Sequence, residues 1–190
     1  KMVIIKNRDS AVNWTVNPGN STLFGGSFYL ILNSTSAKVA NSNMYSSYSN
    51  SSAFYLSTNS SANGNTNSHV AYCFADVEGY SKFGSYTGNG STDGTFVYTG
   101  FKPKMVIIKT TSAAFAWTIL DTERNPGNLV HDVLYPSLVN AEADATTYAS
   151  FDAVSNGFKL RNTHQYTNYN NYNYIYMAFA ENPFKNSTAR

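Results

Sequence analysis

Histidine is the side chain best suited to act as a base near neutral pH, and the chain has three, His69, His131 and His164. A serine triad requires a histidine close to both a serine and a carboxylate. Only His131 has an adjacent carboxylate, Asp132, and none of the three lies at a recognisable spacing from a serine. An adjacent His-Asp pair is more often a surface feature, so we expect no catalytic histidine.

Pairs of carboxylates could hydrolyse glycosidic bonds or bind calcium. The candidates are Asp121 with Glu123, Asp76 with Glu78, and Asp93. Asp-x-Glu occurs freely in turns, and no stretch has the regular acidic spacing of a calcium-binding loop. We therefore predict that the chain is not an enzyme and has no catalytic residue, no metal site and no cofactor.

Aromatic and amide side chains are concentrated in residues 163–174, Thr-His-Gln-Tyr-Thr-Asn-Tyr-Asn-Asn-Tyr-Asn-Tyr. Binding loops use tyrosine for rigid contact area and asparagine for adaptable hydrogen bonds. The alternative is a solvated hairpin tip. Under the binding interpretation, four tyrosines are candidate ligand-binding residues: Tyr166, Tyr169, Tyr172 and Tyr174.

The positions of these residues depend on an internal repeat. Residues 1–6, Lys-Met-Val-Ile-Ile-Lys, return unchanged as residues 104–109, and residues 70–75 match residues 175–180. Self-similarity over about a hundred residues indicates a repeated structural unit. We predict two tandem domains, residues 1–80 and residues 81–190.

The second copy of the repeat is preceded by residues 84–103, which have no counterpart before Lys1. If these residues form the opening strands of a domain, the first copy lacks its opening strands within the given sequence. An unfilled strand position would leave unpaired backbone groups and exposed apolar surface. We therefore expect a longer polypeptide whose upstream part supplies these strands.

Short apolar runs separated by turn signals such as Asn156-Gly157 predict antiparallel sheets. In the strand expected near residues 173–180, Tyr174, Tyr176 and Ala178 face one way while Ile175 and Met177 face the other. A sheet with two apolar faces must be covered on both sides. We predict an all-β fold of two tandem antiparallel β-sandwich repeats, jelly-roll or lectin-like, with little helix, confined to residues 141–147.

Two further positions concern the core. Trp14 and Trp117 occupy the same place in the two copies of the repeat, which predicts core residues rather than exposed sugar-stacking rings. Cys73 is the only cysteine, so no intrachain disulfide is possible. Ala178 stands at its place in the second copy, and we expect a small buried residue.

Composition excludes two classes of partner. Charged residues make up 13% of the chain, its formal net charge is +2, and no run of Lys or Arg offers a footprint for nucleic acid. No apolar run approaches the ~20 residues that a membrane span requires. We therefore expect neither nucleic-acid binding nor membrane insertion.

Several stretches resemble a repeated domain of bacteriophage virion proteins, especially those of marine and cyanobacterial phages. The resemblance lies in residues 70–90, which contain Glu78-Gly79-Tyr80, and in residues 93–103, 155–162 and 176–184. It covers nearly the whole chain. In that family the domain usually stands at the end of tail-fibre or other virion structural proteins, and its function is poorly defined.

The resemblance implies a β-sandwich module located on the virion, plausibly for receptor attachment, and it implies no catalytic residue. We expect a structural and attachment module of a tail fibre that binds a host-surface receptor or glycan. The expected partners are other virion proteins and its own upstream chain, in a homotrimer that gains avidity from weak sites. The alternatives are a capsid decoration or head-fibre protein and a secreted carbohydrate-binding adhesin.

Overall fold

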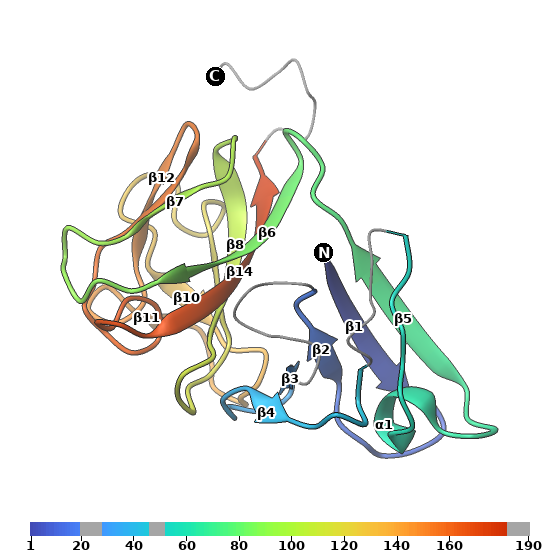
Figure 1. Cartoon of the computed structure of the whole chain (residues 1–190). Coiled ribbons are helices and arrows are strands. Elements are labelled where there is room, and N and C mark those ends of the chain that lie inside the picture. The colour runs from blue at the N-terminus through green and yellow to red at the C-terminus, as the bar shows by residue number, and fades with distance from the viewer. Residues whose placement is uncertain (20–27, 46–51, 182–190) are drawn as a thin grey trace.

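The structure is a computed structural model, and it describes residues 1–19, 28–45 and 52–181. In these residues the fold is all-β with almost no helix, as predicted (Figure 1). Within the described residues, three antiparallel sheets contain five, six and three strands.

The first sheet is built around β1 (Met2–Asn7), a β-branched run that favours extended backbone. β1 pairs with β2 (Thr15–Asn17) on one side and with β5 (His69–Phe74) on the other, and β5 forms one outer edge of the sheet (Figure 1). The order is β4-β3-β2-β1-β5. The strands are β1 (Met2–Asn7), β2 (Thr15–Asn17), β3 (Phe28–Ile31), β4 (Val39–Ala40) and β5 (His69–Phe74).

The second sheet is formed by β6 (Ser81–Thr87), β8 (Pro103–Thr110), β9 (Thr118–Asp121), β10 (Asp132–Leu134), β11 (Ala143–Asp144) and β14 (Asn173–Ala180). Its order is β11-β10-β9-β8-β14-β6. The third sheet has the order β12-β13-β7 and contains β7 (Phe96–Tyr98), β12 (Phe151–Val154) and β13 (Gly157–Leu160).

Strand order and register agree between the first sheet and most of the second. Ile4 lies opposite Tyr72 in the first sheet, and at the matching repeat positions Ile107 lies opposite Met177 in the second. The correspondence extends from β4-β3-β2-β1-β5 to β11-β10-β9-β8-β14. The second sheet has one additional strand, β6, which pairs with β14.

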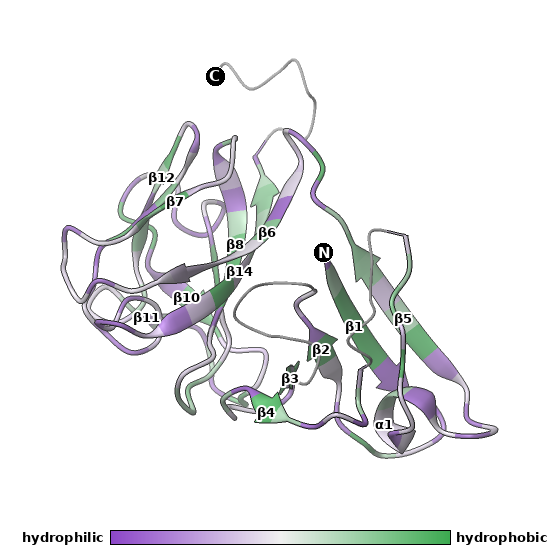
Figure 2. Ribbon diagram, viewed as in Figure 1, coloured by the Kyte–Doolittle hydropathy of each residue, from purple (hydrophilic) through white to green (hydrophobic). Residues whose placement is uncertain are grey.

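The second sheet lies between the other two, and each of its faces is buried (Figure 1). Tyr174, Tyr176 and Ala178 pack towards the third sheet, while Ile175 and Met177 pack towards the first. The alternation in the sequence predicted these two sets, and the structure confirms them. In Figure 2 hydrophobic residues follow β1, whose Met2 and Ile4 also belong to the core between the first and second sheets.

The two tryptophans differ in burial. Trp117 is fully buried between the first and second sheets, and its Nε1 donates a hydrogen bond of 2.9 Å to the carbonyl oxygen of Ile31. Trp14 is half-buried, packs at the margin of the same core and stacks on Tyr72. Both side chains therefore serve packing. Of the two, only Trp117 forms a hydrogen bond between the first half of the chain, residues 1–80, and the second half, residues 81–190.

The expected position of the helix and the expected burial of Cys73 are both wrong. The helix in the described residues is α1 (Ser60–Asn63), which begins after Asn59, whose side chain accepts a hydrogen bond from the backbone of Ser61. Residues 141–147 instead contain β11 and a turn in which the Asp144 carboxylate accepts from Thr146, because short acidic side chains favour local bonds over helix. Cys73 is exposed rather than buried.

Among the described residues, no helix is long and apolar enough to span a membrane.

Candidate functional site

Residues 162–172 form the loop that connects β13 of the third sheet with β14 of the second. Asn168 is fully buried, and its Nδ2 lies 2.8 Å from the carbonyl oxygens of Ser91 and Asn162 and 3.0 Å from Oδ1 of Asn89. Its Oδ1 accepts a hydrogen bond from the backbone of Asn89. This amide therefore fixes the loop to the turn at residues 88–94.

Two buried tyrosines, one in β6 and one in β14, form hydrogen bonds to the backbone of the loop. The Tyr86 hydroxyl donates to the carbonyl oxygen of Thr167 at 2.6 Å, and the Tyr174 hydroxyl donates to that of Gln165 at 3.0 Å. The Tyr174 hydroxyl also accepts from the backbone of Tyr169 at 2.9 Å. Burial raises the pKa of both phenols above the usual range, so they keep the protons that these hydrogen bonds require.

The four predicted tyrosines occupy different environments. Tyr169 is 42% exposed, and Tyr172 is half-buried with its ring centroid 4.8 Å from that of Tyr169 in an edge-to-face pair. Tyr166 is half-buried, and Tyr174 is fully buried in the core. We call Tyr169 and Tyr172 the tyrosine pair, because these two of the four offer adjacent ring surface to a ligand.

The structure places Tyr166 in an aromatic cluster that the sequence did not indicate. Its ring packs against Phe115, Tyr135, Tyr148 and His164 at centroid distances between 5.2 and 5.9 Å. Burial lowers the pKa of His164, which favours the neutral imidazole. The residues come from separated segments, so no local spacing could have identified the cluster.

The histidine and carboxylate candidates show no catalytic arrangement. His131 Nδ1 lies 3.3 Å from Asp132 Oδ1 and 3.6 Å from Asp144 Oδ1, and no hydrogen bond reaches that nitrogen within the part of the chain that is described. Asp121 binds Arg124, with side-chain contacts of 2.7 Å. Backbone and side-chain hydrogen bonds from Arg124 outweigh partial burial and lower the pKa of the Asp121 carboxyl, so it is suited to an ion pair rather than to proton donation.

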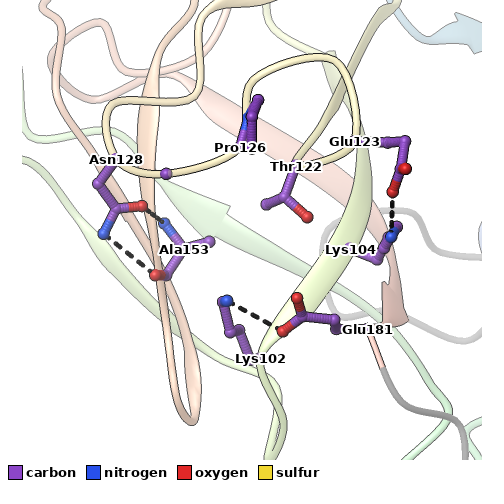
Figure 3. Close-up of a pocket in the computed structure, with 9 residues that line it drawn as sticks. Lys102, Lys104, Thr122, Glu123, Pro126, Asn128, Ala153 and Glu181 are labelled. Atoms are coloured by element: carbon purple, nitrogen blue, oxygen red, sulfur yellow. Dashed lines mark hydrogen bonds and ion pairs between the residues drawn. The ribbon is translucent and has the colours of Figure 1, made fainter. Parts of the chain in front are cut away.

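A shallow hollow of about 400 Å³ lies beside β8 (Figure 3). Two Lys–Glu ion pairs line it, Lys102 with Glu181 at 2.9 Å and Lys104 with Glu123. Asn128 closes one side through two hydrogen bonds to the backbone of Ala153. Because each of these charged groups already has an opposite charge as its partner, an ionic ligand would compete with an existing ion pair here.

Asp76, one of the carboxylates considered for calcium binding, is paired with basic side chains. Asp76 lies 3.1 Å from the Lys82 ammonium and 3.5 Å from that of Lys1, and it accepts a hydrogen bond from the backbone of Phe83. Across residues 1–19, 28–45 and 52–181, no group of three or more His, Cys, Asp or Glu side chains could hold a metal ion.

The fold and the loop at residues 162–172 define an all-β domain of stacked antiparallel sheets that presents a tyrosine- and asparagine-rich loop. The chain belongs to the family described as "Domain of unknown function (DUF7483)", which matches residues 1–183. No curated protein and no solved structure matches the chain.

Proposed function

We propose that the chain is a non-enzymatic structural and attachment module that binds a surface glycan through the tyrosine pair. The observation that carries this proposal is the exposure of adjacent rings, Tyr169 and Tyr172, on a loop fixed by the buried Asn168. Aromatic rings present apolar faces on which a sugar can stack. The neighbouring Asn170 and Asn171 are exposed and add hydrogen-bonding groups.

Preorganisation is the physical reason for preferring this loop. Ordering a flexible loop on binding costs about 0.5–1.5 kcal/mol per immobilised side chain. Here the backbone is already held by hydrogen bonds from Gly88 to Tyr172, from Gly90 to Asn168 and from Asn171 to Gly88. Asn171 has a φ of 60°, a conformation that asparagine tolerates better than most residues. A ligand would meet a loop whose ordering cost is largely met in folding.

We further propose that the two halves are tandem repeats of one β-sandwich. The equal strand order and register of the first and second sheets support this proposal. In the second half, the third sheet supplies the facing layer, with Phe151 and Phe158 packed against the second sheet. In the first half, a cluster of Ile5, Met44 and Tyr45 occupies the corresponding face.

The resemblance to phage virion proteins supports placing the module on an external appendage, most naturally a tail fibre. Several weak glycan sites in a homotrimer would act together, and multivalency raises avidity without any new contact. The partners on this proposal are other virion proteins, the upstream chain and a host-surface glycan.

Binding of the 190-residue chain to an immobilised panel of bacterial lipopolysaccharides and capsular polysaccharides would test the function. We predict that Tyr169→Ala and Tyr172→Ala each weaken binding to a panel member by at least about fivefold, since truncating a central aromatic contact costs more than about 1 kcal/mol. Tyr98→Ala is the matched control, because Tyr98 is exposed but lies on β7. Equal affinity of all three variants and the parent chain would contradict the proposal.

A further inference from the structure

The two equivalent strands β5 and β14 have different neighbours. β14 pairs with β8 along one edge and with β6 along the other. β5 pairs with β1 in the matching register, but in the described residues no strand pairs with its other edge (Figure 1). Half of the backbone N–H and C=O groups of an edge strand point away from its neighbour, so β5 presents a row of free hydrogen-bonding groups.

The side chains show the same difference. Ala71, Tyr72 and Cys73 are exposed, with Tyr72 at 49%. Their counterparts in β14, Tyr176, Met177 and Ala178, are between 0% and 4% exposed. The sequence pattern that is buried in one sheet is thus exposed in the other.

β5 also lacks the features that usually protect an edge strand. Proteins blunt exposed edges with lysine, proline, bulges or charged side chains. The sequence of β5 is His-Val-Ala-Tyr-Cys-Phe, and it pairs with β1 over all six residues without a register shift. β6, which forms one of the two edges of the second sheet, does carry a lysine, Lys82. A long, regular, apolar edge such as β5 indicates a strand position that is filled in the assembled protein.

We propose that the free edge of β5 accepts a β-strand of the same type as β6, joined to β1 in the way that β6 and β7 lead into β8. The repeat itself provides the template. Within residues 81–110, β6 pairs with β14, β7 pairs with β13, and the buried Phe101 lies in the connection to β8. The same connectivity before β1 would cover both β5 and the cluster of Ile5, Met44 and Tyr45.

The template fixes the register of the added strand. Phe83 lies opposite Met177 and Tyr86 lies opposite Tyr174. By the equivalence of β14 and β5, the phenylalanine of the added strand lies opposite Tyr72 and its tyrosine lies opposite His69. The phenylalanine then extends the core between the first and second sheets, where Phe83 already packs against Phe74 at 5.5 Å.

The alternative occupant of this edge is the β5 strand of a second copy of the chain. Pairing of two β5 edges would satisfy the backbone groups, but it would bring no counterpart of β7 or Phe101 to the cluster behind the first sheet. The opening segment of the repeat satisfies both requirements, so we assign the edge to it.

The decisive experiment adds the opening segment to the intact chain. A copy of residues 79–103 is fused directly before Lys1, so that its Pro103 precedes Lys1 as Pro103 precedes Lys104, and the reaction of Cys73 with a soluble thiol reagent is measured in native conditions. Cys73 is the only cysteine, and it is exposed in the unfused chain. We expect the fusion to slow the reaction by about tenfold or more, because the thiol becomes accessible only when the added strand opens.

The matched control is a fusion that carries Phe83→Asp and Tyr86→Asp in the copied segment alone. It has the same length but places charges where the core requires rings, so Cys73 should react as fast as in the unfused chain. Hydrogen exchange at residues 69–74 should be slowed only by the unmodified fusion. Equal reactivity in both fusions would overturn the proposal. So would an unfused chain that is dimeric in solution with Cys73 protected, because the occupant would then be a second copy.

Discussion

Lys109 is a fully buried lysine whose Nζ donates to the carbonyl oxygens of Thr110 at 2.9 Å and Thr35 at 3.1 Å. Within the described residues no carboxylate pairs with it. Desolvation therefore favours the neutral amine and lowers the pKa of Lys109 to about 7. The lysine contributes to the contact between the two halves, because Thr35 lies in the first and Lys109 in the second.

This buried amine predicts a pH dependence of stability. Between about pH 7 and pH 10 the unfolded chain keeps the Lys109 proton and the folded chain releases it, so the free energy of unfolding rises with pH, by at most about 1.4 kcal/mol per unit. This gain in stability is lost as the pH falls from about 10 to about 7, and below about pH 7 both states hold the proton, so the dependence ends. We expect the difference in stability between the parent chain and Lys109→Met to vary with pH between 7 and 9, as measured by urea denaturation. Parallel stability curves would contradict the lowered pKa of Lys109.

A second prediction concerns the stability that the buried side-chain amide of Asn168 provides. Asn168→Ala removes the hydrogen bonds to Asn89, Ser91 and Asn162, and it leaves the acceptor at the buried Asn162 unsatisfied, at a cost of about 1–3 kcal/mol for a buried group. We expect a loss of at least about 2 kcal/mol in chemical denaturation and weaker glycan binding, although Tyr169 and Tyr172 are unchanged. Asn170→Ala is the control for stability, because Asn170 is exposed in the same loop. Equal stability of both variants would contradict the role of the buried amide.

Among the elements, the third sheet depends on a close approach at Gly157. A Cβ at this position would lie 2.2 Å from the carbonyl oxygen of Val97 in β7, which is backbone and cannot rotate away. We expect Gly157→Ala to lower the free energy of unfolding by about 1–3 kcal/mol, the usual cost of overpacking. Ser155→Ala, in the exposed turn of the same hairpin, should change stability by less than about 0.5 kcal/mol. Similar midpoints for the two variants would contradict this packing.

At this scale the sequence predicts regular features better than irregular ones. The alternation along β14 correctly predicted its two buried faces, because the side-chain period of a strand follows from backbone geometry. The same alternation placed Tyr174 beside Tyr176 and Ala178 and could have identified it as a core residue. Instead, the tyrosine-rich composition of the loop led us to include it among the ligand-binding candidates.

Features that depend on tertiary neighbours could not be predicted from the sequence. Cys73 has the pattern of a buried residue, yet its exposure depends on whether a strand covers β5. The cluster around Tyr166 joins residues 115, 135, 148 and 164, which no local motif connects. The helix expected at residues 141–147 failed because the side chain of Asp144 bonds to Thr146 and favours a turn.

The whole molecule is joined through the core between the first and second sheets. Trp117 packs there with Met2, Ile4, Val16 and Leu30 from the first half and with Phe83, Ile175 and Met177 from the second. Its indole donates to Ile31 across the same boundary. We therefore expect the two halves to unfold in one transition, because neither can lose this core alone.

Trp117→Ala tests this coupling. Truncation of a buried tryptophan costs about 3–5 kcal/mol, and the loss should accelerate hydrogen exchange in β1 as well as in β9. Trp14→Ala is the matched control, because Trp14 occupies the same repeat position but is half-buried. It should have a smaller effect on β9. Faster exchange confined to β9 in Trp117→Ala would show that the halves are independent.

We propose that the tyrosine pair is the glycan-binding surface of the molecule. The most direct test is a crystal structure of the chain with the tightest-binding member of the bacterial glycan panel. We predict a sugar ring packed on Tyr169 and Tyr172, with Asn170 or Asn171 hydrogen-bonded to its hydroxyl groups. A sugar bound instead in the hollow between Lys102 and Glu123, with the tyrosine pair bare, would contradict the account.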